Sequence, residues 1–87
     1  MIAMIGGVVM KVDMNLVTKA SSGDRDAFGE LYNSCYKDLY KFALYTLGNA
    51  DDAADVVSDT FVDIWRGLPK LREPEAFSSW VFRILSI

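Results

Sequence analysis

The sequence predicts an all-α protein, a compact bundle of three main helices preceded by one short helix. Apolar residues recur at helical spacing throughout the chain. No run of four or more residues alternates in strand fashion between turn signals. The 87 residues include only two prolines and six glycines, which leaves room for long helices. With 52% hydrophobic residues, the chain has enough apolar side chains for the core of one domain.

The residue types in the chain argue against an enzyme. There is no histidine, the commonest general base and metal ligand. The single cysteine, Cys35, has no partner for an internal disulfide and lies on an apolar helix stripe, where a thiol acts as a small hydrophobe. We therefore expect no catalytic residue, no metal site and no cofactor. Taken alone, the net charge of −3 also argues against nucleic-acid binding.

The chain begins with the apolar run MIAMIGGVVM, which is too short for a membrane-spanning helix of about 20 residues. A signal peptide would carry positive residues before such a run. Here the first positive residue, Lys11, comes after it. We expect residues 1–13 to form a disordered or loosely packed leader and residues 14–87 to form the domain. A cytoplasmic protein with no membrane insertion is the expectation.

Capping signals mark the first two helices. A short helix is expected from about Asn15 to Ala20, ended by the Ser-Ser-Gly that follows. Asp24 is a good N-cap for the second helix, and Gly48 fits the position just after its end. Between them lies a broad apolar stripe that we expect to be buried, made of Ala27, Phe28, Leu31, Tyr32, Cys35, Tyr36, Leu39, Tyr40, Ala43 and Leu47.

The third helix is expected to begin after Asn49 as N-cap, with Asp52 completing a variant of the capping box. On a helical wheel one set of apolar positions faces inward, and its members are Ala54, Val57, Phe61, Ile64 and Leu68.

The opposite side of this helix carries a row of aspartates. Asp52, Asp55, Asp59 and Asp63 are spaced 3, 4 and 4 residues apart, so they share one face. Like charges at this spacing repel by about 0.2–0.5 kcal/mol per pair. The positive end of the helix dipole explains the first of them, but not Asp59 and Asp63. Arg66 follows one turn after Asp63 and is a candidate ion-pair partner for it.

Gly67 and two prolines predict a loop after the third helix, with Pro74 placed as the first residue of a fourth helix. This last helix is apolar almost all round toward Ile87 and has no cap or polar tail. We expect it to be truncated at the chain end, and the chain to be a piece of a longer protein.

Four features now stand in one order: DAFGELY, then LGNADDAADVVSDTFVDIW, then a loop with a basic pair, then FSSWVFRI. From Asn15 to Ile87 the chain resembles the N-terminal domain, region two, of bacterial RNA polymerase sigma factors. Within that family it is similar to the small extracytoplasmic-function (ECF) group. The resemblance implies a compact helical bundle that catalyses nothing, takes no small-molecule substrate and is followed by a helix-turn-helix domain that this chain lacks.

The resemblance also implies three macromolecular partners. The third helix would dock on a basic coiled coil in the largest subunit of core RNA polymerase. An anti-sigma factor is a further implied partner. The residues at the family's polymerase-binding positions are Asp55, Ser58, Asp59, Val62, Asp63 and Arg66, with Trp65 at the edge. These positions lie outward from Val57, Phe61 and Ile64, so helical periodicity and the resemblance agree.

The third implied partner is the promoter −10 element, whose non-template strand the domain would hold open. The implied DNA-binding residues are Lys70, Arg72, Ser79, Trp80 and Arg83. Other interpretations stay open: Trp80 and Phe82 are equally suited to the core, Phe77 is expected there, and Ser78 and Ser79 equally suit the first helical turn. Val81 stands where housekeeping members carry a second aromatic, which implies stricter dependence on promoter sequence.

Two alternatives compete with this interpretation. One is a module that mimics a sigma factor and binds an anti-sigma factor without contacting DNA; the aromatic and basic residues near Trp80 argue against it. The other is a helical bundle with no nucleic-acid role. The acidic net charge is compatible with the resemblance, because a polymerase-binding surface should be acidic and the family's basic stretch comes after Ile87.

Overall fold

The computed structural model describes residues 2–5 and 8–85, with side chains from Val12 to Leu85. Its helices are α1 (Met14–Ser21), α2 (Arg25–Leu47), α3 (Ala50–Gly67) and α4 (Phe77–Leu85). Two 3-10 turns, Leu68–Lys70 and Pro74–Ala76, lie between α3 and α4. The predicted bundle of three main helices and one short N-terminal helix is confirmed.

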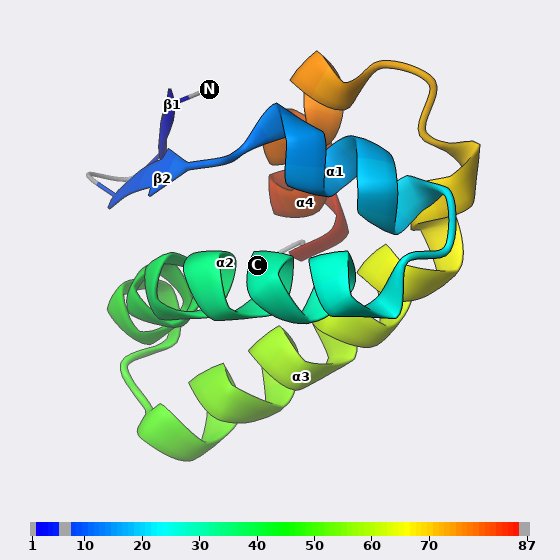
Figure 1. Ribbon diagram of the computed structural model, residues 1–87. Coiled ribbons are helices and arrows are strands. Elements are labelled where there is room, and N and C mark those ends of the chain that lie inside the picture. The colour runs from blue at the N-terminus through cyan, green and yellow to red at the C-terminus, as the bar shows by residue number, and fades with distance from the viewer. Residues whose placement is uncertain (1, 6–7, 86–87) are drawn as a thin grey trace.

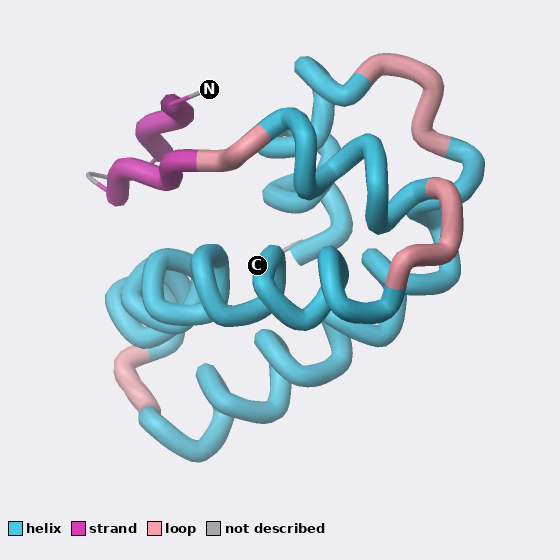
Figure 2. The backbone as a smooth tube through the Cα atoms, in the orientation of Figure 1, coloured by secondary structure: helices cyan, strands magenta, loops and turns pink. Residues whose placement is uncertain are grey.

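The helices are arranged around α2, the longest of them. Figure 1 shows α2 and α3 side by side and running in opposite directions, with α1 on the other side of α2. The short helix α4 packs against α3, and α1 also touches both 3-10 turns. The connections between the helices are short loops, as the tube in Figure 2 shows. This arrangement encloses one core.

Strand pairing in the leader was not expected. Strand β1 (Ile2–Ile5) pairs antiparallel with β2 (Val8–Lys11), with Ile5 opposite Val8, and β2 lies beside α2. The sequence held a signal for this pairing, because two apolar runs rich in β-branched residues flank a Gly-Gly dipeptide. The division into a leader of residues 1–13 and a domain of residues 14–87 stays a prediction.

The predicted helix caps are formed. The Asp24 carboxylate accepts a hydrogen bond of 3.0 Å from the Ala27 backbone amide, and the Asn49 side chain accepts one of 3.0 Å from the Asp52 amide. Gly48 ends α2 with φ at 69°, a left-handed conformation that glycine adopts without steric cost. Asp13 caps α1 in the same way, through the amide of Asn15. Each cap satisfies a backbone donor or acceptor that a helix end leaves free.

The core is formed by one side of each helix, and its fully buried large side chains include Leu31, Leu39, Val57, Ile64, Leu68 and Phe77. The prediction that Phe77 is a core residue is confirmed. The prediction for Ala54 was wrong, because its neighbour Ala53 is the fully buried alanine and Ala54 is only partly covered. The buried arc of α3 also includes Thr60, whose hydroxyl donates to the Val56 carbonyl at 2.7 Å. The buried side of α3 is therefore rotated slightly about the helix axis from the side that the apolar residues alone predict.

Three of the tyrosines in α2 form a row along the helix. The rings of Tyr32 and Tyr36 stack at 5.5 Å, and those of Tyr36 and Tyr40 stack at 6.0 Å. All three are partly buried, as expected for packing residues with a polar tip. Tyr45 differs, since 79% of it is exposed. Across the described residues, no helix is long and apolar enough to cross a membrane.

Candidate functional site

The exposed side of α3 forms the first candidate surface. The predicted polymerase-binding residues all lie on it and are exposed, namely Asp55, Ser58, Asp59, Val62, Asp63 and Arg66; we call this set the acidic face. On the opposite side of the same helix, Val57 and Ile64 are fully buried. Because the buried side anchors α3 against α2 and α4, the acidic face is held in one orientation. The structure therefore brings the predicted residues together on one rigid helix.

The carboxylates of the acidic face form no ion pair within residues 12–85. Asp63 and Arg66 were a candidate ion pair, but the structure forms no ion pair between them, and the same holds for Asp55 and Asp59 within residues 12–85. Asp59 and Asp63 are also well beyond the first turn of α3, where the helix dipole would favour them. Within the described part of the chain, no ion pair therefore offsets the repulsion between these carboxylates.

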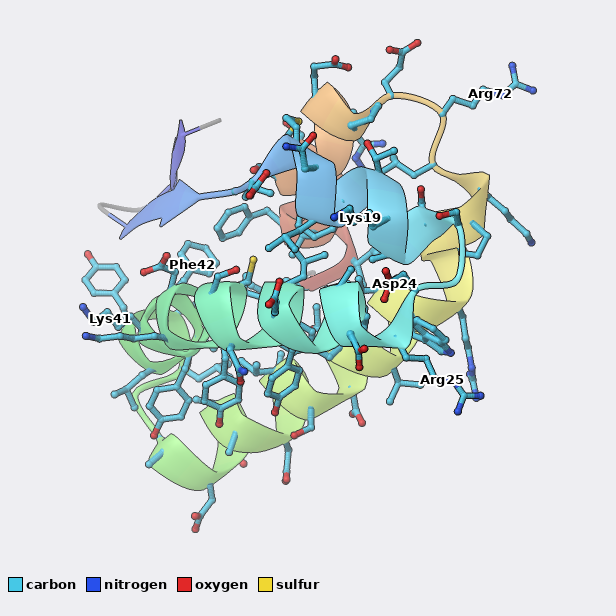
Figure 3. All side chains as sticks on the ribbon, in the orientation of Figure 1. Lys19, Asp24, Arg25, Lys41, Phe42 and Arg72 are labelled. Atoms are coloured by element: carbon cyan, nitrogen blue, oxygen red, sulfur yellow. The ribbon has the colours of Figure 1, made fainter. Side chains whose placement is uncertain are left out.

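An open apolar hollow lies beside the acidic face, between α2 and α3. Phe28 and Tyr32 line it from α2, while Phe61, Val62 and Trp65 line it from α3, with Ser58 at its edge. The rings of Phe28 and Trp65 lie 4.8 Å apart at 59°, and together with Arg25 they line a second hollow. Arg25 is labelled at the start of α2 in Figure 3.

Sequence reasoning missed this hollow, since it assigned Phe28 and Tyr32 to the buried stripe and placed Trp65 only at the edge of the contact. Val62 is 49% exposed and Trp65 is 38% exposed, so the hollow offers apolar surface to a partner. The available signal was the pair of large apolar residues, Val62 and Trp65, on the outward side of α3.

The predicted DNA-binding residues divide into an exposed set and one partly buried residue. Lys70, Arg72, Ser79 and Arg83 are exposed, and Figure 3 shows Arg72 pointing away from the helices. Ser79 and Arg83 are four residues apart on α4 and therefore share a face. Ser78, by contrast, is buried. The structure thus keeps the four polar and basic candidates at the surface.

Trp80, the fifth DNA-binding candidate, is partly buried. Its ring lies 6.1 Å from that of Phe77, and it approaches Gly67 at the end of α3 very closely. Phe82 is also partly buried, with its ring 5.2 Å from that of Phe42 on α2 in an edge contact. The rings of Trp80 and Phe82 therefore both have intramolecular contacts, and each contributes to the packing of α4.

Within the described residues, the helical domain thus presents two candidate binding surfaces on and beside α3, an acidic helix face and an adjoining apolar hollow. Residues 31–86 match the family model described as Sigma-70 region 2, and the chain belongs to that family. The resemblance to sigma factors inferred from the sequence motifs is confirmed.

Several curated proteins are similar to the chain. The ECF RNA polymerase sigma factor SigM of Mycobacterium tuberculosis is 32% identical over 92% of this chain and 41% of its own length. BldN of Streptomyces coelicolor, also an ECF RNA polymerase sigma factor, is 32% identical over 82% of this chain and 27% of its own. The RNA polymerase sigma factor CnrH of Cupriavidus metallidurans is 36% identical over 83% of this chain and 38% of its own. This chain thus spans less than half the length of these relatives. No solved structure matches the chain significantly.

Proposed function

We propose that this protein is the region-two domain of an ECF sigma factor and acts in transcription initiation in the cytoplasm. It binds core RNA polymerase through the acidic face of α3 and recognises the promoter −10 element through α4 and the loop before it. Membership of the sigma-70 region 2 family and the names of the curated relatives support this role. The domain contributes binding and not catalysis.

The observation that carries the proposal is the acidic face, whose exposed carboxylates form no ion pair within residues 12–85. A basic partner would replace repulsion between Asp55, Asp59 and Asp63 with charge-assisted hydrogen bonds. Arginines suit this contact because a guanidinium binds a carboxylate through two parallel hydrogen bonds. Complementary charge would also speed association and reject acidic partners. The proposed partner surface is a basic coiled coil in the largest polymerase subunit.

The apolar hollow extends this contact. It shares Ser58 and Val62 with the acidic face, so a partner helix lying on α3 would also cover the hollow. An apolar side chain of that partner would fill the space beside Trp65 and remove apolar surface from water. Charge would then set the orientation of the complex, and the hollow would slow its dissociation.

The DNA contact depends on fewer exposed groups. Arg83 and the basic residues of the preceding loop, Lys70 and Arg72, are placed to bind phosphates, a contact that weakens as salt is added. Trp80 offers one partly exposed ring for stacking with an unpaired base of the non-template strand.

The test of polymerase binding is a charge reversal, Asp59→Arg or Asp63→Arg, with affinity for core RNA polymerase measured by interferometry. Hydrogen bonds to charged groups contribute about 1.5–3 kcal/mol each, so we expect affinity to fall about ten- to a hundredfold. Glu30→Arg is the matched control, because it makes the same change of charge at an exposed position on α2. Equal affinities for all three variants and the parent chain would refute the assignment of the acidic face.

A second candidate function is a sigma-mimicking module that binds an anti-sigma factor without contacting DNA. The intramolecular contacts of Trp80 and Phe82 favour it, because they leave α4 less free aromatic surface than a DNA-binding helix would present. Both candidates predict a role for the acidic face. Binding of single-stranded −10 oligonucleotides that depends on Trp80 would exclude the second.

A further inference from the structure

A close approach joins the last turn of α3 to the aromatic ring of Trp80. A Cβ atom added to Gly67 would lie 2.7 Å from Cζ2 and 3.3 Å from Cη2 of the indole. A separation of 2.7 Å is well inside the 3.5–4.0 Å that carbon atoms prefer. No side chain larger than that of glycine fits at position 67 while Trp80 keeps its place.

Backbone geometry does not require a glycine at this position. Gly67 has φ at −91° and ψ at −18°, a right-handed conformation that any residue adopts. Glycine is a poorer helix former than alanine, and Gly67 lies at the end of α3, where the chain continues directly into a 3-10 turn. The contact with Trp80 is therefore the structural feature that accounts for glycine here.

The contact is positioned between the two proposed binding surfaces. Gly67 directly follows Arg66 of the acidic face, and Trp80 lies on the helix that carries the DNA-binding candidates. Phe77, which is fully buried, supports the indole from its own helix at a ring distance of 6.1 Å. With these contacts on two sides, the indole is held in one orientation and only part of it remains exposed.

We propose that Gly67 is a positioning residue: the absence of its side chain lets Trp80 rest on the end of α3, and this support sets the orientation in which the indole meets an unpaired promoter base. The inference rests on the proposed function for its DNA readout. The packing of Trp80 against Gly67 does not depend on that function and is measured separately.

The test uses Gly67→Ala in the Trp65→Phe background, which leaves Trp80 as the sole tryptophan of the two in the sequence. The added methyl group displaces the indole, so we expect its emission to shift to the red and its quenching by acrylamide to rise. Gly29→Ala in the same background is the matched control, because Gly29 is an exposed helical glycine with no atom within 4 Å of an added Cβ. The control should leave the Trp80 signal unchanged and raise Tm by about 2–8 °C, as a better helix former does in a small domain.

The second measurement is binding of a single-stranded −10 oligonucleotide, followed by anisotropy of a label on the DNA. Loss of one base–aromatic stack corresponds to about a five- to hundredfold fall in affinity, and we expect at least the lower value for Gly67→Ala. In a Trp80→Phe background the same change should cost less, since the smaller ring lacks the atoms that the new methyl group would meet. Compared with the background in which each is made, Gly67→Ala and Gly29→Ala should leave the affinity for core RNA polymerase unchanged.

The outcomes separate the two claims. An unchanged Trp80 emission in Gly67→Ala would overturn the support of Trp80 by Gly67. A displaced indole with unaltered DNA affinity, in a protein whose Trp80→Ala variant binds DNA poorly, would overturn the positioning role. If Trp80→Ala itself binds DNA as well as the parent chain, the DNA assignment under the proposed function fails, and the positioning role fails with it.

Discussion

The aspartates of α3 have different environments, although they lie on one helix. Asp51 and Asp52 are in the first turn, where the exposed backbone amides favour negative charge. Asp59 and Asp63 lie further along, without that benefit and without an ion-pair partner within residues 12–85. They weaken the isolated helix slightly, so their presence is better explained by a partner than by stability. A reversal at Asp59 or Asp63 should therefore affect binding much more than folding.

Cys35 is a second residue whose surroundings change its chemistry. Burial raises the pKa of its thiol from 9.0 to about 11, while a contact of 3.8 Å with the Ser34 hydroxyl lowers it by a smaller amount. The thiol is therefore protonated at neutral pH and unreactive toward alkylating reagents in the folded protein.

The raised pKa predicts a loss of stability at alkaline pH. From pH 9.0 upward the unfolded chain loses the thiol proton while the folded protein keeps it until about pH 11. The contribution of Cys35 is thus fully present below pH 9.0 and falls by about 2–3 kcal/mol as the pH rises through this window. Urea denaturation across the window measures this loss, with Cys35→Ala as the reference because it lacks the thiol and keeps every other side chain. Parallel pH profiles for the two chains would contradict the prediction.

At the scale of elements, the beginning of α3 depends on a single side chain. Asn49 accepts the hydrogen bond of the Asp52 amide at 3.0 Å, and only Gly48 separates it from the end of α2. Asn49→Ala removes this acceptor, and we expect a loss of about 0.5–2 kcal/mol in the free energy of unfolding. Asn49→Asp should restore most of it, since aspartate is an equally good N-cap.

The control for this prediction is Asn33→Ala, an exposed asparagine inside α2. Alanine is the better helix former there, so this variant should be as stable as the parent chain or slightly more stable. Chemical denaturation of the three variants side by side provides the measurement. A loss for Asn33→Ala as large as that for Asn49→Ala would show that the cap contributes nothing specific.

Local signals predicted the elements better than they predicted how the elements face one another. The caps at Asp24, Gly48 and Asn49 depend on residues within one turn, so the sequence was sufficient for them. The buried arc of α3 depends on where α2 and α4 lie, and its alanine was therefore assigned one position too late. The hairpin of β1 and β2 was missed because its apolar runs do not alternate with polar residues.

For the whole molecule, the contact between α2 and α3 is the central interface. Phe61 lies within it, with its ring 4.3 Å from that of Tyr32 and 6.4 Å from that of Tyr36. Phe61→Ala should lower the free energy of unfolding by about 3–5 kcal/mol, a large part of the total for a domain of this size. Thermal denaturation followed by circular dichroism would show the loss as a lower Tm in a single transition.

The neighbouring residue is the control for that variant. Val62 is 49% exposed, whereas Phe61 is 4% exposed, so Val62→Ala should change stability by about 0.5 kcal/mol or less. If the two variants unfold at the same temperature, Phe61 is not the central residue of the interface that its contacts indicate.

The candidate site was also predictable only in part. Exposure of the acidic face followed from helical periodicity. The apolar residues of α3 recur on one side, which faces the core, so the polar residues between them face outward. The hollow lined by Phe28 and Trp65, and the contact between Gly67 and Trp80, each join two helices. No spacing within one helix reveals such contacts, since they depend on how close the helices approach.

One consequence follows from α3 carrying both the acidic face and the support for Trp80. Gly67 lies twelve positions after Asp55 along uninterrupted helix, a separation of about 18 Å at 1.5 Å per residue. In the proposed function, this rigid length sets the distance and the angle between the polymerase contact and the captured base. One residue inserted between Asp63 and Gly67 would turn the two contacts about 100° out of phase and lengthen their separation by about 1.5 Å. Such a chain would be expected to bind each partner separately and to fail when both must be held at once.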